Sequence, residues 1–257
     1  MPASNLIAGM NYFRNIKING VTEESYKDID SLIESVKAFA RLTSKSVYIM
    51  DLYKQNFIFV SENPLFFSGY TAEEIKELGF DFFIKSTNNE NLSKISEIND
   101  KTIELIHSLP IEDRTKLILV DTYSTINKQT QKELLLCHQS TPLRLSSTGE
   151  AWLILCVESI ASAGNKQEII AYTENPNKIW KYDENDKQWQ SLEWLKLKEV
   201  EKDILRLSAM GLCMKEIAAE LGCSYDTIKF YRKELLKKFG AKNIIEAYNT
   251  ALIYRMI

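Results

Sequence analysis

The chain lacks the long apolar runs of a membrane protein. No stretch of its 257 residues approaches the roughly 18 to 20 consecutive apolar residues that a membrane-spanning helix requires. The first residues, MPASNLIAGMNYFRNIK, also lack the basic stretch followed by an apolar core that marks a secretory signal. We therefore expect a cytoplasmic protein with no membrane partner.

Cysteine and histidine are scarce, with four of the first and two of the second. The cysteines show no CxxC spacing and no histidine at zinc-finger spacing, so neither a disulfide framework nor a zinc site is predicted. A glycine-rich phosphate loop, a GxSxG elbow and an HExxH helix are all missing. We predict no metal site, no catalytic residue and no enzymatic activity.

Charge is unevenly distributed, although the net value is only -3. Residues from 196 onward carry 12 Lys and Arg against 8 Asp and Glu, which leaves 20 against 27 for residues 1–195. A basic tail on an acidic body is typical of a chain whose tail meets a polyanion. The length favours two domains of unequal size.

The periodicity of apolar residues predicts a leading helix and a mixed domain. Residues 23–42 form an amphipathic helix whose apolar stripe needs a partner surface, namely Ile29, Leu32, Ile33, Val36 and Phe39. We expect this helix and the following sheet to join in a dimer, because the stripe must be covered. Strands are predicted at 46–51, 56–61, 116–127, 131–146 and 150–160.

Helices are expected between the second and third strands. Thr71 and Glu74 form a capping box that opens a short helix, and a longer amphipathic helix covers about 91–108. This order predicts a five-stranded antiparallel sheet with helices on one face. Polar clusters around EIIAYT, KIWKY and KQWQ make residues 166–195 a hairpin and linker rather than another core.

Four helical segments follow residue 196, with breaks at three glycines. MKEIAAEL forms a short helix, Gly222 and Cys223 form a turn, and Ser224 can cap the helix YDTIKFYRKELLKKF. One stripe of that helix is suited to packing: Ile228, Tyr231, Leu235 and Phe239. The opposite stripe offers cations to a DNA groove, or is a solvated face: Asp226, Lys229, Phe230, Lys233 and Lys237.

The stretch LKLKEVEKDILRLSAMGLCMKEIAAELGCSYDTIKFYRKELLKKFGAKNIIEAYNTAL resembles the LuxR-type helix-turn-helix domain over its whole length. The matching positions are Leu197, Glu201, Leu205, Gly211, Glu216, Ile217, Ala218, Leu221, Ser224, Thr227, Ile228, Lys229, Lys238, Phe239 and Ala247. Glu199 and Val200 depart from the family's usual ProArg, Tyr231 stands where His is frequent, and Phe230 where valine is frequent.

The resemblance implies that the third helix enters the major groove of double-stranded DNA and that the fourth pairs two chains. The residues implied in DNA binding are Ser224, Tyr225, Thr227, Lys229, Phe230, Arg232, Lys233, Lys237, Lys238 and Lys215. Those implied in dimerisation are Ile244, Ala247, Tyr248 and Ala251. Phe230 either packs on thymine methyl groups or covers a neighbouring element.

Residues 46–160 resemble a PAS sensor domain in their order of strands and helices. The run FIFVSENPLFFSGYTAEEIKELG carries the likeness through Asn63, Pro64, Gly69, Tyr70, Thr71, Glu73 and Glu74, and AWLILCVESI matches the last strand. The resemblance implies a domain that senses a signal, with room for a small-molecule effector, or one that pairs with other proteins.

Familiar cofactors of such domains leave few traces here. A flavin photosensor would need a cysteine in the helix after the connection, and the stretch from Phe80 to Leu92 contains none. Haem would need an axial ligand, for which His107, and after it His138, is available, although each reads more simply as an ordinary hydrogen-bonded histidine. We predict that no cofactor is bound and that neither haem nor flavin copurifies.

Two other regulator classes share parts of this pattern. An acyl-homoserine-lactone receptor carries the same tail, but the tryptophans here come late in the chain: Trp152, Trp180, Trp189 and Trp194. A phosphorelay response regulator would need the strand-helix alternation of a receiver domain, which is missing although Asp51 and Asp121 lie near strands.

These observations together predict a DNA-binding transcriptional regulator that forms a homodimer. Its fold class is α+β, with a PAS-like five-stranded antiparallel sheet and helices followed by an all-α four-helix domain. The predicted segments are 1–42 for the N-terminal segment and amphipathic helix, 43–165 for the PAS-like domain, 166–195 for the hairpin and linker, and 196–257 for the helix-turn-helix domain.

Overall fold

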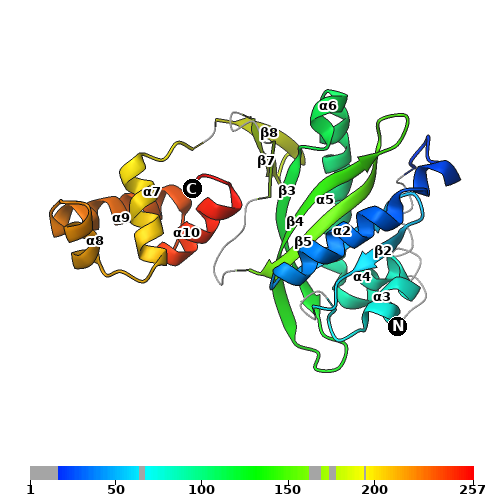
Figure 1. Cartoon of the computed structure of the whole chain (residues 1–257), viewed down its shortest axis with the longest axis horizontal. Coiled ribbons are helices and arrows are strands. Elements are labelled where there is room, and N and C mark those ends of the chain that lie inside the picture. Colours follow the sequence, from blue (N-terminus) through cyan, green and yellow to red (C-terminus); the bar gives the residue numbers. More distant parts are fainter. Residues whose placement is uncertain (1–16, 64–66, 162–168, 174–177, 194) are drawn as a thin grey trace. The chain divides into compact units, whose positions relative to one another are not determined.

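The computed structural model describes residues 17–63, 67–161, 169–173, 178–193 and 195–257, which divide into two compact units (Figure 1). The described residues up to Ala161 and from Ile169 to Glu193 form the first unit, and those from Leu195 onward form the second. The first unit combines strands and helices and the second is helical, so the predicted α+β class is confirmed.

The first unit is built on one sheet of eight strands in the order β2-β1-β5-β4-β3-β6-β7-β8. Every neighbouring pair is antiparallel. The predicted count of five is wrong, although the five predicted strands are present as β1 to β5. The strands are β1 (Ser46–Asp51), β2 (Asn56–Val60), β3 (Ile118–Ile126), β4 (Glu133–Leu145), β5 (Ala151–Ile160), β6 (Ile170–Tyr172), β7 (Ile179–Asp183) and β8 (Gln188–Leu192).

The three additional strands come from the segment predicted to be a hairpin and linker. Aromatic side chains of β7 and β8 pack against helix α5 (Asn89–Ser108). The Tyr182 hydroxyl donates to Glu97 Oε1 at 2.7 Å, and Trp189 Nε1 donates to the Lys101 carbonyl oxygen at 2.9 Å. Two of the polar clusters that suggested a linker, at 162–165 and 175–177, lie outside the described residues.

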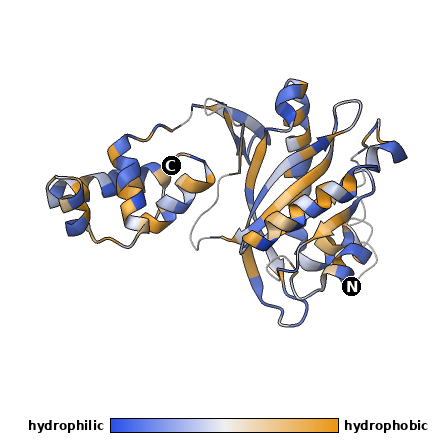
Figure 2. Ribbon diagram, in the orientation of Figure 1, coloured by the Kyte–Doolittle hydropathy of each residue, from blue (hydrophilic) through white to orange (hydrophobic). Residues whose placement is uncertain are grey.

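Helices cover both faces of the sheet, which corrects the expectation that they lie on one face (Figure 1). Helix α2 (Ile29–Leu42), preceded by η1 (Glu23–Tyr26), packs on one face against Val47, Ile49 and Phe59. Hydrophobic residues run along the strands and along α2 (Figure 2). The opposite face is covered by α3 (Ala72–Leu78), α4 (Asp81–Ser86) and α5, and α6 (Ile111–Arg114) follows.

The apolar stripe of α2 is covered largely by the chain's own sheet. Ile29, Leu32, Ile33 and Val36 belong to the core on that face, whereas Phe39 is 50% exposed and Leu42 is 88% exposed. The stripe therefore does not by itself require a second copy of the chain.

The second unit contains four helices around one small core. They are α7 (Glu199–Ala209), α8 (Met214–Glu220), α9 (Tyr225–Phe239) and α10 (Ile244–Ile253). Ile204, Leu205, Ile217, Ile228 and Leu235 are fully buried at its centre. This arrangement confirms the four predicted helical segments. In neither unit do the described residues include a helix long and apolar enough to cross a membrane.

Candidate nucleic-acid interface and ligand cavity

The turn between α8 and α9 has the compact geometry that a helix-turn-helix requires. Gly222 adopts φ +60°, a left-handed backbone conformation that residues other than glycine rarely adopt. The Ser224 hydroxyl then accepts a hydrogen bond from the Thr227 amide at 3.1 Å, and it lies 2.9 Å from the Thr227 hydroxyl. The predicted cap at Ser224 is thus confirmed, and it fixes where α9 begins.

Helix α9 buries one stripe and exposes the other. Ile228 and Leu235 are fully buried, and Tyr231 and Phe239 pack against the same core. On the other side Lys229, Lys233 and Lys237 are exposed, and within the described residues they form no ion pair. This face is free to meet a polyanion.

Phe230 extends the exposed face with an aromatic ring. It is 59% exposed, and its ring lies 5.6 Å from that of Tyr231 in an edge-on arrangement. Tyr225, at the start of the same helix, is 41% exposed, and Lys215 is exposed on α8. Within this unit Phe230 does not cover a neighbouring helix, which leaves its ring available to a partner.

Two cations of α9 are instead bonded to helix α7. Arg232 Nη1 donates to the Ser208 hydroxyl at 3.1 Å. Lys238 Nζ donates to Glu201 Oε1 at 2.5 Å, and Glu201 Oε2 accepts from the Lys198 amide at 2.8 Å. Burial raises the pKa of Glu201, but the bonds from Lys238 and Lys198 outweigh it, and the pKa is lowered overall. Arg232 and Lys238 therefore hold α9 against α7, besides any contact with DNA.

The residues predicted for dimerisation lie mostly inside the second unit. Ile244, Ala247 and Ala251 are buried in its core, and Tyr248 is half-buried at the edge. The apolar residues that α10 does expose are Ile245, at 47%, and Leu252, at 45%. The predicted residues therefore lie on the side of α10 that packs against α7 and α9, not on its exposed side.

A row of ionisable side chains crosses the sheet of the first unit on the face that is covered by α3, α4 and α5. Asp121 pairs with His138 across β3 and β4, and His138 pairs with Glu158 across β4 and β5. His138 Nδ1 lies 2.6 Å from Asp121 Oδ1. Glu158 Oε1 accepts from the Tyr48 and Tyr123 hydroxyls at 2.8 and 2.9 Å. Sequence reasoning missed this row, whose one signal is polar residues within otherwise apolar strands.

Burial perturbs the titration of this row. It raises the pKa of Glu158 to about 7, despite opposing effects of His138 and the two tyrosines. Burial lowers the pKa of His138, but Asp121 and Glu158 outweigh this and raise it well above 6.5. His107, the other histidine considered for haem, is exposed. Among the described residues no group of three potential ligands could hold a metal ion.

We expect the first unit to lose stability as pH rises from about 4.5 to about 7. Above pH 4.5 the unfolded chain ionises Glu158, whereas the folded chain keeps its proton until about pH 7. The raised pKa corresponds to a loss on the order of 3 kcal/mol between these limits. Glu158→Gln should remove most of this slope while keeping an acceptor for both tyrosines.

Urea unfolding at pH 5 and pH 6.5, followed by tryptophan fluorescence, measures this difference below the range in which the raised pKa of His138 also lowers stability. Trp152, Trp180 and Trp189 lie in the first unit, and the chain from 196 onward has no tryptophan. Glu133→Gln, at an exposed position of β4, is the matched control. An equal pH slope in wild type and Glu158→Gln would contradict the assignment.

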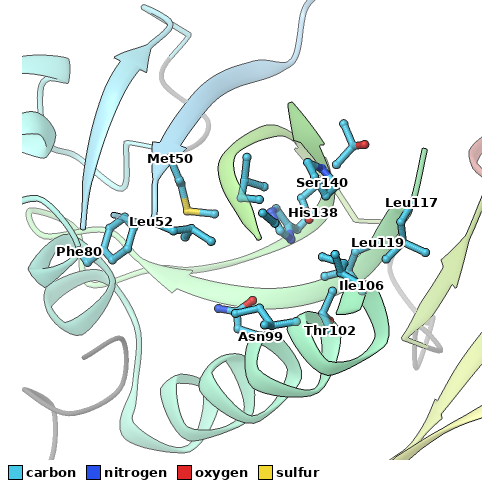
Figure 3. Close-up of a pocket in the computed structure, with 15 residues that line it drawn as sticks. Met50, Leu52, Phe80, Asn99, Thr102, Ile106, Leu117, Leu119, His138 and Ser140 are labelled. Carbon is cyan, nitrogen blue, oxygen red and sulfur yellow. The ribbon is translucent and has the colours of Figure 1, made fainter. Parts of the chain in front are cut away.

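A cavity lies between this sheet face and α5 (Figure 3). Its polar residues are Asn99 and Thr102 of α5 and His138, Ser140 and Thr141 of β4. The remaining walls are mainly apolar side chains, among them Met50, Leu52, Phe80, Ile106, Leu117 and Leu119.

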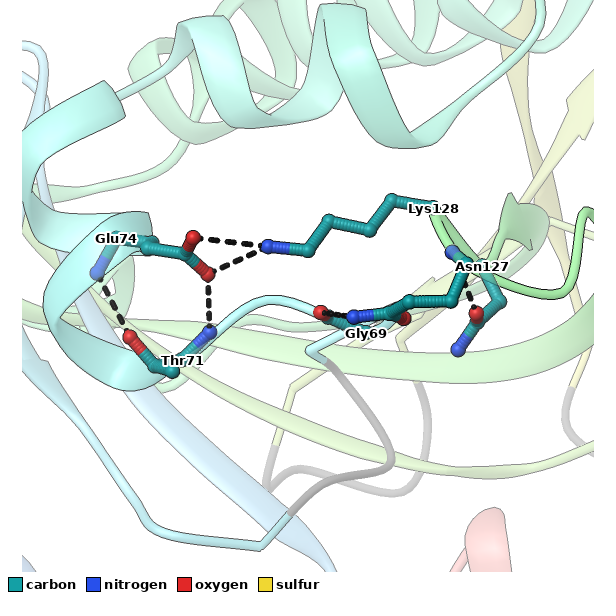
Figure 4. Close-up of polar contacts among 6 residues, drawn as sticks. Gly69, Thr71, Glu74, Asn127 and Lys128 are labelled. Carbon is teal, nitrogen blue, oxygen red and sulfur yellow. Dashed lines mark hydrogen bonds and ion pairs between the residues drawn. The ribbon is translucent and has the colours of Figure 1, made fainter.

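Polar contacts fasten the segment before α3 to the turn between β3 and β4 (Figure 4). Glu74 and Thr71 form the predicted capping box, with distances of 2.8 and 3.1 Å. Lys128 Nζ contacts both Glu74 oxygens at 2.7 and 2.8 Å, and Gln129 Nε2 donates to the Gly69 carbonyl at 2.6 Å. Gly69, Thr71 and Glu74, which carry part of the PAS resemblance, thus link this segment to the sheet. Pro64, another residue of that resemblance, lies outside the described residues.

Comparison with known proteins identifies the second unit. Residues 196–251 match the family described as bacterial regulatory proteins, luxR family. An uncharacterized transcriptional regulatory protein, YvfU of Bacillus subtilis, is 43% identical over 51 residues, which are 20% of this chain and 26% of that protein. The chain thus spans about a quarter of that curated relative. Its C-terminal unit is a LuxR-type helix-turn-helix domain.

Solved structures show a weaker likeness that extends over most of the chain. A phage VqmA complex with DPO is 18% identical, with a TM-score of 0.32 and coverage of 90% of this chain and 92% of that one. The Vibrio cholerae VqmA dimer without target DNA is 19% identical, with a TM-score of 0.33 and coverage of 85% and 86%. Escherichia coli SdiA is 14% identical, with a TM-score of 0.27 and coverage of 99% and 98%.

Proposed function

We propose that the chain is a cytoplasmic transcriptional regulator that binds double-stranded DNA through α9. The observation that carries this proposal is the exposed cationic face of Lys229, Lys233 and Lys237, set on a helix whose start is fixed by the Gly222 turn and the Ser224 cap. The match of residues 196–251 to the luxR family supports it. In this geometry Lys229, Phe230 and Lys233 approach base edges, and Lys237, Ser224 and Thr227 approach phosphates.

The first unit is proposed as a PAS-like sensor of a signal. Strands β2-β1-β5-β4-β3 are contiguous in the sheet, and the predicted helices lie between the second and third strands along the chain. The cavity between this sheet and α5 provides a place for a small-molecule effector. An effector that binds there would change the position of α5. Because Tyr182 and Trp189 are hydrogen-bonded to α5, strands β7 and β8 would move with it.

The regulator is proposed to act as a homodimer. On α10 the exposed Ile245 and Leu252 are seven positions apart, and the half-buried Tyr248 lies between them, so all three follow one side of the helix. This side suits pairing of two second units, whereas Ile244, Ala247 and Ala251 support it from within. Two copies would place two α9 helices on successive half-sites of an operator.

Single alanine variants of Lys233 and Lys237 test the proposed geometry. Replacing Lys233 should cost about 1 to 3 kcal/mol against a specific operator, with a smaller loss on random DNA. Replacing Lys237 should weaken both about equally and reduce the salt dependence by roughly one charge. Titrations at several salt concentrations, on an operator selected from random duplexes, measure both effects. Equal losses for the two variants on both DNAs would contradict the distinction between base and phosphate contacts.

A further inference from the structure

The cavity under α5 shares lining residues with a second, more polar cavity, and we call the two its lobes. The apolar lobe has a volume of about 50 Å³ and the second lobe about 30 Å³. Met50, Asn99 and His138 line both of them, and Figure 3 shows these three at the first lobe. Met50 is an unbranched and flexible side chain, so it can adapt to a bound molecule.

The second lobe is lined by groups that favour a positive charge. Three aromatic residues, Tyr48, Phe83 and Tyr123, line this lobe together with the acidic Asp121. Aromatic faces attract cations, most strongly where water is excluded. No Lys or Arg is among the described residues that line either lobe.

The charges beside this lobe are unequal in number. Asp121 and Glu158 are two buried carboxylates, and His138 is the one cation in their row. His138 is bonded to Asp121, while Glu158 receives only neutral phenol donors. The second oxygen of Glu158, Oε2, is buried and has no hydrogen-bond partner among the described residues. A buried carboxylate without a counterion is costly, so a second cation beside Glu158 would stabilise its charged form.

We propose that the cavity binds a small amphipathic cation, whose positively charged head lies in the lobe of Asp121, Tyr48 and Tyr123 and whose apolar part lies against Leu52, Leu117 and Leu119. This inference rests on the proposed sensing function of the first unit. With the ligand bound, the two carboxylates Asp121 and Glu158 face two cations, His138 and the ligand. Anionic effectors are disfavoured because they would add a negative charge beside two buried acidic groups.

The size of the cavity limits the cation. Both lobes are small beside the cavity of about 150 Å³ that accepts benzene in another protein, so the ligand has only a handful of non-hydrogen atoms. Asn99 can accept or donate one further hydrogen bond from α5. The titratable groups that face the row are Tyr48, Tyr123 and Cys156 besides its own members, because α4 and α5 present only Phe83, Ile95 and Asn99 to the lobe.

Three probes with one carbon skeleton and different charge test the proposal on the full chain: propan-1-amine, propan-1-ol and propanoate. Thermal unfolding of the first unit is followed by tryptophan fluorescence in phosphate buffer at pH 7.5, so that the buffer supplies no amine. At tenfold excess over its dissociation constant the amine should raise the midpoint by about 2 to 4 °C. It should bind at least about tenfold more tightly than the alcohol, and the carboxylate should produce no shift.

Glu158→Gln separates the charge from the shape of the cavity. In this variant the amine should lose its advantage, while the alcohol should bind as before and thereby show that the cavity is intact. Glu133→Gln should behave as wild type. Equal binding of amine and alcohol by the wild-type chain, or an undiminished preference in Glu158→Gln, would overturn the proposal. DNA binding measured without any probe decides the proposed regulator function separately.

Discussion

Replacing Lys238 by Met should destabilise the helical unit by about 3 kcal/mol. The variant removes the cation bonded to Glu201, whose side chain is 3% exposed. A carboxylate left buried without its partner bears most of the cost of desolvation, and the Lys198 amide alone cannot offset it. Urea unfolding followed by circular dichroism at 222 nm measures the change. Lys237→Met, at the neighbouring exposed position, should change stability by less than about 0.5 kcal/mol.

A second substitution shows whether the buried charge is the cause. The double variant Glu201→Leu/Lys238→Met removes both charges together, and buried pairs replaced in this way are often neutral or stabilising. It should recover most of the lost stability, apart from about 1 kcal/mol for the missing cap at Lys198. Wild-type stability of Lys238→Met, combined with weaker binding to every DNA sequence, would instead make Lys238 a phosphate contact without a structural role.

The difference between free and bonded cations on α9 was within reach of the sequence. Arg232 follows Ile228 by four residues and precedes Leu235 by three, so helical spacing alone puts it beside the packing stripe. Lys238 follows Leu235 by three residues and lies on the same side. The family resemblance grouped both with the DNA-binding residues, whereas their positions predict contacts with α7. Glu201 was recognised as a family position, but its partner becomes visible only when α7 and α9 are packed together.

The sheet shows where periodicity works and where it fails. Strands β1 to β5 were predicted to within a few residues because their apolar runs are long and bounded by turns. Strands β6 to β8 are short, and the polar sequence between them resembles a linker. Their real signal is the aromatic residues Tyr182 and Trp189, whose burial depends on α5 lying across the sheet. No spacing rule within residues 166–195 contains that information.

The buried row and its cavity could not be predicted for a related reason. Asp121, His138 and Glu158 lie on three strands, and only the register of β3, β4 and β5 makes them neighbours. A one-residue shift in that register would turn the row to the opposite face of the sheet. Sequence reasoning assessed His138 as a haem ligand and Asp121 as a phosphate acceptor separately. It had no means to see that they form a pair.

Replacing Lys229 and Lys233 together by Ala should abolish most specific DNA binding. Each lysine that reads a base edge is worth about 1 to 3 kcal/mol of discrimination, so the pair should cost at least about thirtyfold in affinity for the selected operator. Neither side chain lies on the packing stripe, and the stability of the helical unit should be unchanged. The control Lys196→Ala/Lys242→Ala removes the same number of exposed charges elsewhere in the second unit. It should lower affinity for specific and random duplexes alike.

Methylation interference on the selected operator tests most directly whether α9 reads the major groove. Methylation of guanine N7 modifies the major-groove edge, and methylation of adenine N3 modifies the minor-groove edge. For the wild-type chain, N7 methylation at one or more guanines of each half-site should prevent binding, and N3 methylation at the same half-site should be tolerated. The residual binding of Lys229→Ala/Lys233→Ala should show no such N7 effect. Interference confined to adenine N3, or an N7 pattern unchanged in the double variant, would contradict the assignment of α9 as the helix that reads DNA.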